Sequence, residues 1–392
     1  MKKKHLDLLK RIVETPSPTG FEVGVAQVVK DELAGYATDI NTDTMGSVHA
    51  ALMKGPQDCR TMMLAAHMDE IGLMVTYISP EGYLYVSSLG GVDAAILPGM
   101  RVNVHGADEV LRGIIGRKPI HLIDADDRKN VTPIDKLFID LGLPGDEVAK
   151  KVSVGDPVTF AVGLETFGDD MAVSRAFDDK AGVYISCRVL QKLASDEDYS
   201  GNFVAAMTVQ EEIGTRGAIT SAHAISPDIA LAFDVTHATD YPGIEKSQYG
   251  EIVCGKGPVI ARGPNINPVV FEMLVNAAES EGIAYQLEAE PSVTGTDARS
   301  IQIARGGIPT GLISIPLRYM HTPAEVIDLN DLQAAVKLIA RFAKDVQSCE
   351  GFVPDVRNLT RFTVGCDFEE DRPDVDGRSN CAPPRIKPSD AI

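Results

Sequence analysis

The sequence predicts an α/β fold in which a mixed, mostly parallel sheet is flanked by helices and carries an inserted small β-barrel-like domain. Segments with apolar residues at helical spacing alternate with short, almost continuous apolar runs, and such runs are typical of strands buried on both faces. One internal stretch has instead short alternating segments separated by Gly and Pro. A chain of 392 residues, 44% of them hydrophobic, is long enough to form two domains.

Five segments have the apolar periodicity of helices with one core-facing stripe. The first, from Leu6 to Val13, follows a basic start and lacks the small-residue cleavage site of a signal peptide. The others are Phe21–Tyr36, Lys180–Leu193, Pro268–Glu281 and Leu329–Gln347. We expect these helices to pack above and below the sheet.

Four nearly continuous apolar runs predict the strands of that sheet. They are Thr61–Ala66, Phe203–Val209, Ile229–Phe233 and Thr310–Ile315. Runs of this kind are buried on both faces when helices cover the sheet, so we expect them to form its centre.

The stretch 71–167 differs in texture from the rest of the chain. Its alternating segments are Tyr83–Ser87, Arg101–His105, Leu111–Gly116 and Asp156–Ala161. This pattern divides the chain into an α/β domain of residues 1–70 and 168–350, an inserted β-rich domain of residues 71–167, and a tail of residues 351–392. The tail is rich in Pro and charged residues, which is typical of a segment that is partly disordered or docked on a neighbour.

Charge and composition argue against several classes of partner. The formal net charge is −19 with no basic stripe to offset it, so a polyanion such as nucleic acid would be repelled. No apolar run approaches the roughly 20 residues that a helix needs to span a bilayer. The six cysteines are far apart and lack CxxC spacing, which favours reduced thiols in a cytoplasm over a disulfide scaffold.

Potential metal ligands follow the ends of the predicted strands. In chain order they are His67 and Asp69, then Glu211 and Glu212, then Asp234, and finally His321 a few residues beyond the fourth strand. In an open α/β sheet, ligands bind in the crevice outside the carboxyl ends of the strands. Each of these residues alone has an ordinary structural explanation, but together they predict one site.

Asp178 and Asp179 add two adjacent carboxylates just before a predicted helix, and one of them could bridge two metal ions. Two histidines with three or four carboxylates form a ligand set suited to zinc, cobalt or manganese, and unlike a structural Cys-rich zinc site. Such a set can activate water for peptide hydrolysis.

The adjacent acids Glu211 and Glu212 can have different roles in the site. Neighbouring residues of an extended segment point in opposite directions, so one of them can bind metal while the other acts as the general base. By the same rule Asp69 shares a strand face with His67 and could accept the second imidazole N–H, which would fix the tautomer.

Six motifs, AHMDEIG, SRAFDDKAG, VQEEIGTRGA, AFDVTHATD, GTDA and IPLRYMHTPAEVI, occur in this order and spacing. Together they resemble the glutamyl-aminopeptidase and tetrahedral-aminopeptidase family of di-metal metallopeptidases. The resemblance extends from about Leu6 to Phe342. The combination is specific, whereas each motif alone is weak.

The resemblance implies a phosphorylase/hydrolase-like core and an enzyme that removes N-terminal residues from short peptides. By this analogy Asp178 bridges two divalent ions, zinc or cobalt with manganese as a further option. The remaining implied ligands are His67 and Asp234 for one ion, and Glu212 and His321 for the other. Glu211 is then the general base. The strand pattern, and not the resemblance, adds Asp69 as a further catalytic residue beside His67.

The family also implies a cis peptide bond between Asp178 and Asp179. It implies that the inserted domain mediates dimers and that dimers assemble into a hollow tetrahedral dodecamer. Two features depart from the pattern. His237 stands where many relatives carry a non-basic residue, and we interpret it as a loop residue; the tail after Gly351 is longer than the family's.

Four further residues have two interpretations each. Arg318 and Tyr319 either line the substrate cleft or pack ordinarily. Thr296 and Asp297 either help to hold the peptide's amino group or cap the following helix, which is the commoner single use. The remaining histidines are interpreted as structural or surface residues: His5, His49, His105, His121 and His223.

Two other functions would use some of the same residues. A carboxylate pair can hydrolyse glycosidic bonds, but that chemistry does not need two metal ions. A catalytically silent, metal-stabilised scaffold would have no use for a base beside the metals, so Glu211 argues against it. The preferred N-terminal residue and the native metal stay open at this point.

Overall fold

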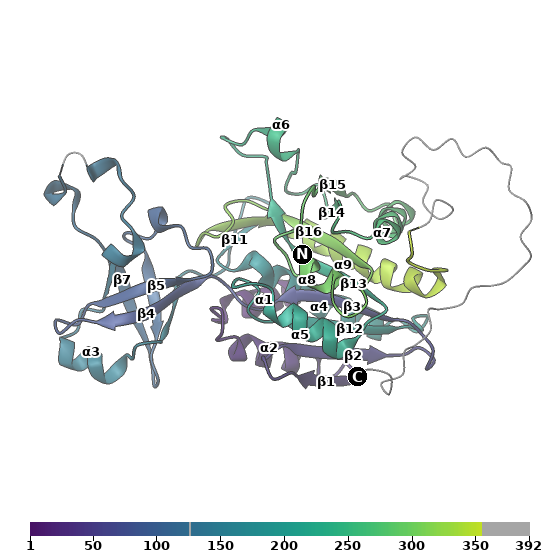
Figure 1. Ribbon diagram of the computed structural model, residues 1–392, viewed down its shortest axis with the longest axis horizontal. Coiled ribbons are helices and arrows are strands. Elements are labelled where there is room, and N and C mark those ends of the chain that lie inside the picture. The colour runs from purple at the N-terminus through teal and green to yellow at the C-terminus, as the bar shows by residue number, and fades with distance from the viewer. Residues whose placement is uncertain (125–126, 355–392) are drawn as a thin grey trace, which may run out of the picture.

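The computed structural model describes residues 1–124 and 127–354, so the predicted tail falls almost wholly outside the described residues. The described chain forms an α/β domain and a closed β-barrel that stands to one side of it (Figure 1). The expected fold class, a mixed and mostly parallel sheet flanked by helices with an inserted barrel, is confirmed.

The α/β domain is built on an eight-stranded sheet of order β1-β2-β12-β3-β13-β16-β14-β15. The strands are β1 (Asp39–Thr42), β2 (Val48–Met53), β3 (Thr61–His67), β12 (Asn202–Thr208), β13 (Ile229–His237), β14 (Val259–Arg262), β15 (Gln286–Ala289) and β16 (Thr310–Leu317). The four central strands β12, β3, β13 and β16 are mutually parallel and buried along almost their whole length. Their carboxyl ends therefore share one edge of the sheet.

These four strands are the four predicted from apolar runs, with one consequential difference. β13 extends to His237 because its pairing with β16 continues as far as His237 opposite Leu317. Asp234 consequently lies inside a strand and not after it. The interpretation of His237 as a loop residue was wrong, since it is the exposed last residue of β13.

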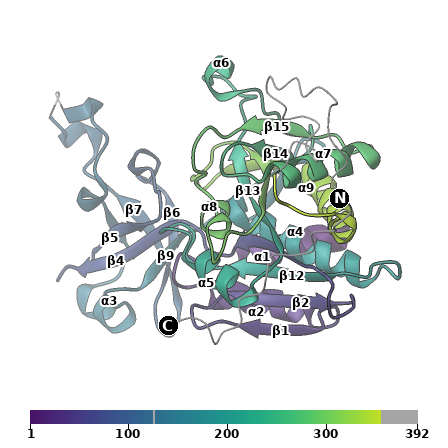
Figure 2. The same cartoon turned by 45° about the vertical axis from the view of Figure 1, so that its right-hand side comes forward.

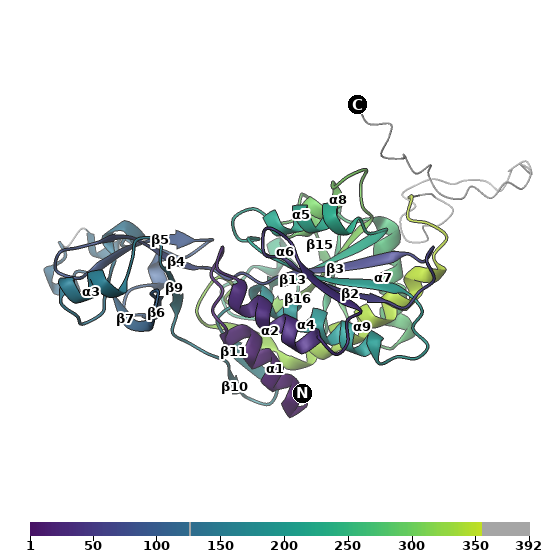
Figure 3. The ribbon, with the colours of Figure 1, turned by 90° about the horizontal axis from the view of Figure 1, so that it is seen from below.

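Helices cover both faces of the sheet (Figure 3). On one face α1 (Lys3–Glu14), α2 (Val23–Leu33), α4 (Phe177–Ala194) and α9 (Leu329–Asp345) pack together, with α4 against β3, β12 and β13. On the other face lie α5 (Arg216–Ile225) and α8 (Ala298–Gln302), while α7 (Pro268–Ser280) packs against β14 and α9. The short helix α6 (Lys246–Tyr249) projects from the domain in Figure 1.

The barrel is closed by six strands in the order β4-β5-β8-β7-β6-β9 (Figure 2). They are β4 (Gly72–Ile78), β5 (Leu84–Leu89), β6 (Arg101–His105), β7 (Val110–Gly116), β8 (Phe138–Asp140) and β9 (Pro157–Phe160), and α3 (Gly145–Lys151) packs on β4. The barrel has its own apolar core, which includes Leu73, Val86 and Ile139, separate from the core of the α/β domain. The barrel therefore packs around a core of its own.

A second, small three-stranded sheet lies beside the main one. It joins β10 (Glu165–Phe167) and β11 (Met171–Ser174), which precede α4, to β17 (Glu325–Asp328), which precedes α9. Ser174 on β11 lies opposite Glu325 on β17, which places Glu325 beside the start of α4. Within the described residues, no helix is long and apolar enough to cross a membrane.

The described cysteines are free. Cys187 is buried, whereas Cys59, Cys254 and Cys349 are half-buried. The other two cysteines lie outside the described residues.

Candidate active site

The edge where β12, β3, β13 and β16 end brings the predicted ligands together. Two groups of side chains there could each hold a metal ion: His67, Asp178 and Asp234, and Asp178, Glu212 and His321. Within each group the ligand atoms lie within 4.8 Å of one another. Asp178 belongs to both groups, and it reaches the sheet edge from the start of α4.

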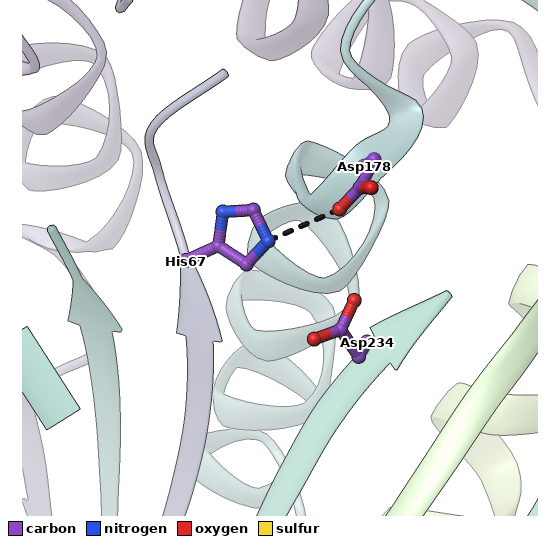
Figure 4. Close-up of side chains that lie close together, drawn as sticks. All are labelled: His67, Asp178 and Asp234. Atoms are coloured by element: carbon purple, nitrogen blue, oxygen red, sulfur yellow. Dashed lines mark hydrogen bonds and ion pairs between the residues drawn. The ribbon is translucent and has the colours of Figure 1, made fainter. Parts of the chain in front are cut away.

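The side chains of the first group point toward one another from β3, β13 and the start of α4 (Figure 4). His67 at the end of β3 points Nε2 at Oδ1 of Asp178, 3.1 Å away, and Asp234 reaches toward them from β13. All three side chains are buried.

The second group uses the other oxygen of the same carboxylate. His321 Nε2 lies 3.3 Å from Asp178 Oδ2 and 3.7 Å from Glu212 Oε2. Asp178 therefore presents one oxygen to each imidazole.

These separations fit a metal ion in each group. Zinc binds nitrogen and oxygen ligands at about 2.0–2.2 Å in tetrahedral geometry, which places two ligand atoms of one ion roughly 3.3 Å apart. The contacts of His67 and His321 with Asp178 have that length. Imidazole and carboxylate donors also suit cobalt and manganese.

The charges of the site point to the same conclusion. Burial raises the pKa of Asp234 well above its ordinary value, and the neighbouring Asp178 raises it further. Burial opposes a charged His67, yet the carboxylates of Asp178 and Asp69 raise its pKa well above the ordinary value. Asp179 Oδ2 is buried and has no hydrogen-bond partner in the described part of the chain. Bound cations would offset this excess of buried negative charge.

The Asp178–Asp179 peptide bond is cis, as the resemblance implied. The same two residues have non-helical backbone angles at the start of α4. Asp179 turns into the helix, where its Oδ1 accepts the N–H of Gly182 at 3.1 Å.

Asp69 contacts the site differently from the prediction. It lies two residues beyond the end of β3, so it does not share a strand face with His67. His67 Nδ1 lies 3.1 Å from the backbone oxygen of Asp69 and 3.5 Å from its carboxylate. The Asp69 carboxylate also accepts the backbone N–H groups of Glu211 and Glu212, at 3.0 and 3.1 Å.

Glu22 extends this arrangement and was not anticipated. Its Oε1 accepts the N–H of Gln210, whose φ of 56° lies in the left-handed region. Three successive backbone N–H groups, from Gln210 to Glu212, thus point at buried carboxylates. Burial raises the pKa of Glu22 to about 7. A lone Glu between Gly20 and a helix gave no sequence signal of this contact.

Glu211 occupies the turn after β12 next to the first metal group. Burial raises its pKa; His67 lowers it, while Asp234 and Asp297 raise it further. Its side chain is half-buried, and its backbone N–H is held by the carboxylate of Asp69, the residue that also contacts His67. No metal group of the described residues contains Glu211, whereas Glu212 belongs to one.

Glu325 is a second residue that the prediction missed. Its carboxylate accepts the backbone N–H of Asp178 at 3.2 Å and that of His321 at 3.1 Å. It therefore joins the backbones of two candidate ligands that lie more than 140 residues apart in the chain. In the motif MHTPAEVI this acid directly precedes Val326 and Ile327, and nothing in that local pattern indicates its contact with Asp178 and His321.

A buried ion network supports the same region. Glu70 accepts from Lys180 Nζ at 2.8 Å and forms a contact with Arg175, and all three side chains are buried. Lys180 also donates to the backbone oxygen of Thr15, and Arg175 to that of Glu14. The network ties the end of α1, the segment after β3 and the start of α4 together.

The four residues with open interpretations are placed as follows. Arg318 forms a two-point ion pair with Asp240 at 2.7 and 2.6 Å, and Tyr319 is half-exposed against Tyr241. Thr296 Oγ1 accepts the N–H of Ala298 at 3.3 Å.

The side chain of Asp297 does not cap α8, although the residue stands at the N-cap position. It is buried, and its Oδ2 accepts from Thr208 Oγ1 at 2.6 Å. Its Oδ1 finds no hydrogen-bond partner among residues 1–124 and 127–354. The expectation that capping is its main use was wrong for this residue, because its side chain turns toward the sheet.

Comparison with models of protein families finds a match that covers most of the chain. The model of the M42 glutamyl aminopeptidase family matches residues 46–338. A lysyl aminopeptidase of Pyrococcus furiosus is 33% identical over 354 residues, which cover 89% of this chain and 99% of that protein.

Solved structures agree in fold. The TET aminopeptidase of the marine sediment archaeon Thaumarchaeota archaeon SCGC AB-539-E09 superposes with a TM-score of 0.84 at 32% identity, covering 88% of this chain and 97% of that one. The TET1 peptidase of Pyrococcus horikoshii has a TM-score of 0.77 at 31% identity, covering 86% and 99% of the two chains. That peptidase is described as able to assemble into a tetrahedron or a large octahedral shell.

Proposed function

Because the chain belongs to the M42 glutamyl aminopeptidase family and is therefore an aminopeptidase, we propose that it removes N-terminal residues from short peptides with two divalent metal ions held on either side of Asp178. The observation that carries this proposal is the shared carboxylate: Oδ1 of Asp178 faces His67 and Oδ2 faces His321. His67 and Asp234 would complete one position, and Glu212 and His321 the other.

Two bound divalent ions would polarise the scissile carbonyl and make the attacking water more acidic. Glu211 receives the proton of that water at its carboxylate and passes it to the leaving amine as the peptide bond breaks. Glu211 is half-buried, and the partial loss of solvent raises its pKa, which makes its carboxylate a stronger base and supports this role. Asp69 holds Glu211 and Glu212 in place through their backbone N–H groups, and its backbone oxygen orients His67.

The substrate's free amino group would meet acidic side chains at this edge of the sheet. Asp297 contributes a carboxylate oxygen with no hydrogen-bond partner within the described residues, and Thr296 lies beside it. At the edge of the proposed substrate site, the ring of Tyr319 packs against Tyr241. Arg318 fixes the same segment by an ion pair with Asp240. We assign these four residues to substrate binding within the proposal.

The proposed native ion is zinc or cobalt, with manganese as a further option, because imidazole and carboxylate ligands accept all three. The proposed location is the cytoplasm, where the free thiols of the described residues would stay reduced.

We also propose that the barrel domain mediates dimers and that dimers build a tetrahedral dodecamer. The assembly described for the TET1 peptidase of Pyrococcus horikoshii supports this proposal, since its chain shares the fold over nearly its full length. Exposed apolar residues on β7 of the barrel offer a surface for the contact.

The proposed function is tested by removing and restoring metal while aminoacyl-nitroanilides and short peptides serve as substrates. We expect EDTA to abolish release of the N-terminal residue and zinc, cobalt or manganese to restore it. A β-glucan substrate is assayed in parallel. Full peptidase activity without metal, or glucan hydrolysis that survives EDTA, would contradict the proposal, and inactivity under every metal would favour the scaffold.

A further inference from the structure

The barrel domain reaches one of the candidate metal ligands directly. Gly90 and Gly91 follow β5 of the barrel, yet the carbonyl oxygen of Gly91 lies 2.9 Å from Nδ1 of His321 in the α/β domain. The two residues are 230 positions apart in the chain. The contact crosses from one domain to the other.

A backbone carbonyl can only accept a hydrogen bond, so Nδ1 of His321 must carry the proton. In the neutral ring, which is the form that binds a metal ion, the lone pair then lies on Nε2, the nitrogen that faces Asp178 and Glu212. A histidine that binds a metal through one nitrogen is oriented by the hydrogen bond at the other.

The two glycines allow this close approach. A Cβ added at Gly91 would lie 2.8 Å from His321 Nδ1 and 3.1 Å from its Cε1. A Cβ at Gly90 would lie 3.0 Å from Oε2 of Glu212. A Cβ contact under 3.0 Å essentially never occurs in proteins and one of 3.0–3.4 Å is uncommon, so a larger residue at Gly91 would displace the loop or the imidazole of His321.

The two metal positions differ in how they are supported. His67, Asp178 and Asp234 all come from the α/β domain, and Nδ1 of His67 faces the backbone oxygen of Asp69 in the same domain. The position of Asp178, Glu212 and His321 is instead supported from the barrel. A change in the barrel loop should therefore affect one ion and spare the other.

We propose that Gly91 of the barrel domain is a positioning residue for the metal ion of Asp178, Glu212 and His321, whose site is complete only when the barrel loop rests against His321. This inference rests on the proposed two-metal function. The inserted domain thus contributes to the metal centre itself in addition to any contact between subunits.

Gly91→Ala tests the proposal in the full-length protein. Gly91 has no positive φ, so alanine adds a methyl group against His321 without backbone strain. Gly35→Ala is the matched control because a Cβ at Gly35 meets nothing within 4 Å and its φ is also not positive. Calorimetric titration of the metal-free proteins with zinc, followed by elemental analysis, gives the number and affinity of the bound ions.

We expect the wild type and Gly35→Ala to bind two ions, and Gly91→Ala to bind the second about 10- to 100-fold more weakly while it keeps the first. Thermal unfolding in EDTA should be the same for both variants. Two ions bound by Gly91→Ala with wild-type affinities would overturn the inference alone. A wild type that binds no divalent ion would instead overturn the proposed function.

A crystal structure of the metal-loaded wild-type protein tests the contact without any variant. We expect Nε2 of His321 on the ion, and Nδ1 within about 3 Å of the Gly91 oxygen. A ring turned so that Nδ1 binds the ion would refute the positioning role.

Discussion

Glu211 and Glu212 are neighbours in the chain with different surroundings. Glu212 lies 3.7 Å from Nε2 of His321 and belongs to a metal group, whereas Glu211 belongs to none in the described chain. Both backbones are held by one carboxylate, that of Asp69. A single buried acid can thus position two residues with separate tasks.

At this scale we predict that Glu211→Gln lowers kcat by about 10²- to 10⁴-fold, the range typical of a lost general base. Fold and metal content should be unchanged, because glutamine has the same shape and Glu211 is not among the candidate ligands. Steady-state kinetics and elemental analysis measure both. Glu197→Gln, at an exposed residue, serves as the control; near-wild-type turnover of Glu211→Gln would remove the residue from the mechanism.

A second prediction at residue scale concerns the shared carboxylate. Asp178→Ala should lower metal occupancy at both positions, because each group loses an oxygen ligand. Asp234→Ala should lower it at one position only. Elemental analysis after dialysis distinguishes two lost ions from one, and two ions retained by Asp178→Ala would show that this carboxylate does not bridge.

At the scale of elements, the site depends on a few buried contacts that join strand ends to the start of α4. Glu325 at the beginning of β17 accepts backbone N–H groups from α4 and from the segment after β16. Glu70, Arg175 and Lys180 join α1, the end of β3 and α4. The small sheet and the ion network therefore fix the position of Asp178 relative to the main sheet.

We predict that Glu70→Gln lowers the free energy of unfolding by about 3–5 kcal/mol, because it leaves buried cations without their carboxylate. Thermal unfolding in EDTA measures the change. Glu281→Gln is the control, since it removes one partner of a partly exposed ion pair with Arg341 and should cost at most about 1 kcal/mol.

The loss of stability caused by Glu70→Gln should depend on pH. Although burial opposes it, the cations of Arg175 and Lys180 lower the pKa of Glu70 to about 2, against a usual 4.5. A carboxyl group with a lowered pKa adds stability above its unfolded-state value and loses it as the pH falls toward the folded-state value. The difference in unfolding temperature between wild type and Glu70→Gln should therefore shrink from pH 5 toward pH 2. A difference that stays constant across that range would contradict the assignment.

At the scale of the whole molecule, the barrel presents two different surfaces. One loop contacts His321, while β7 exposes Val110, Arg112 and Ile114 on one side of the strand. Val110 and Ile114 are more than half exposed, at 57% and 53%. Exposed apolar residues on one strand face are typical of a contact between subunits.

We predict that Ile114→Asp reduces the assembly to smaller particles, because a charge would be buried in the proposed contact between barrels. Analytical ultracentrifugation measures the particle mass. Ser87→Asp, at an exposed residue of β5, should leave the assembly intact. An unchanged mass for Ile114→Asp would exclude this face of β7 from the contact.

The sequence alone determined the class of fold and the identity of the candidate ligands. Apolar runs located the four central strands, and the ligands followed because the carboxyl ends of parallel strands share one edge. Hydrophobic patterning and strand polarity are local properties, so they can be read from one segment at a time. The pairing of His67 with Asp178, and of His321 with the same residue, agrees with the roles implied by the family resemblance.

Only the tertiary structure decided what supports those ligands. The partner of Asp69 is the backbone of Glu211 and Glu212, Glu325 joins Asp178 to His321, and Gly91 of the barrel meets His321. These contacts join residues far apart in the chain, and their geometry depends on how strands and domains pack. No local pattern encodes such a distance, and for that reason the ligands were predictable while their supporting residues were not.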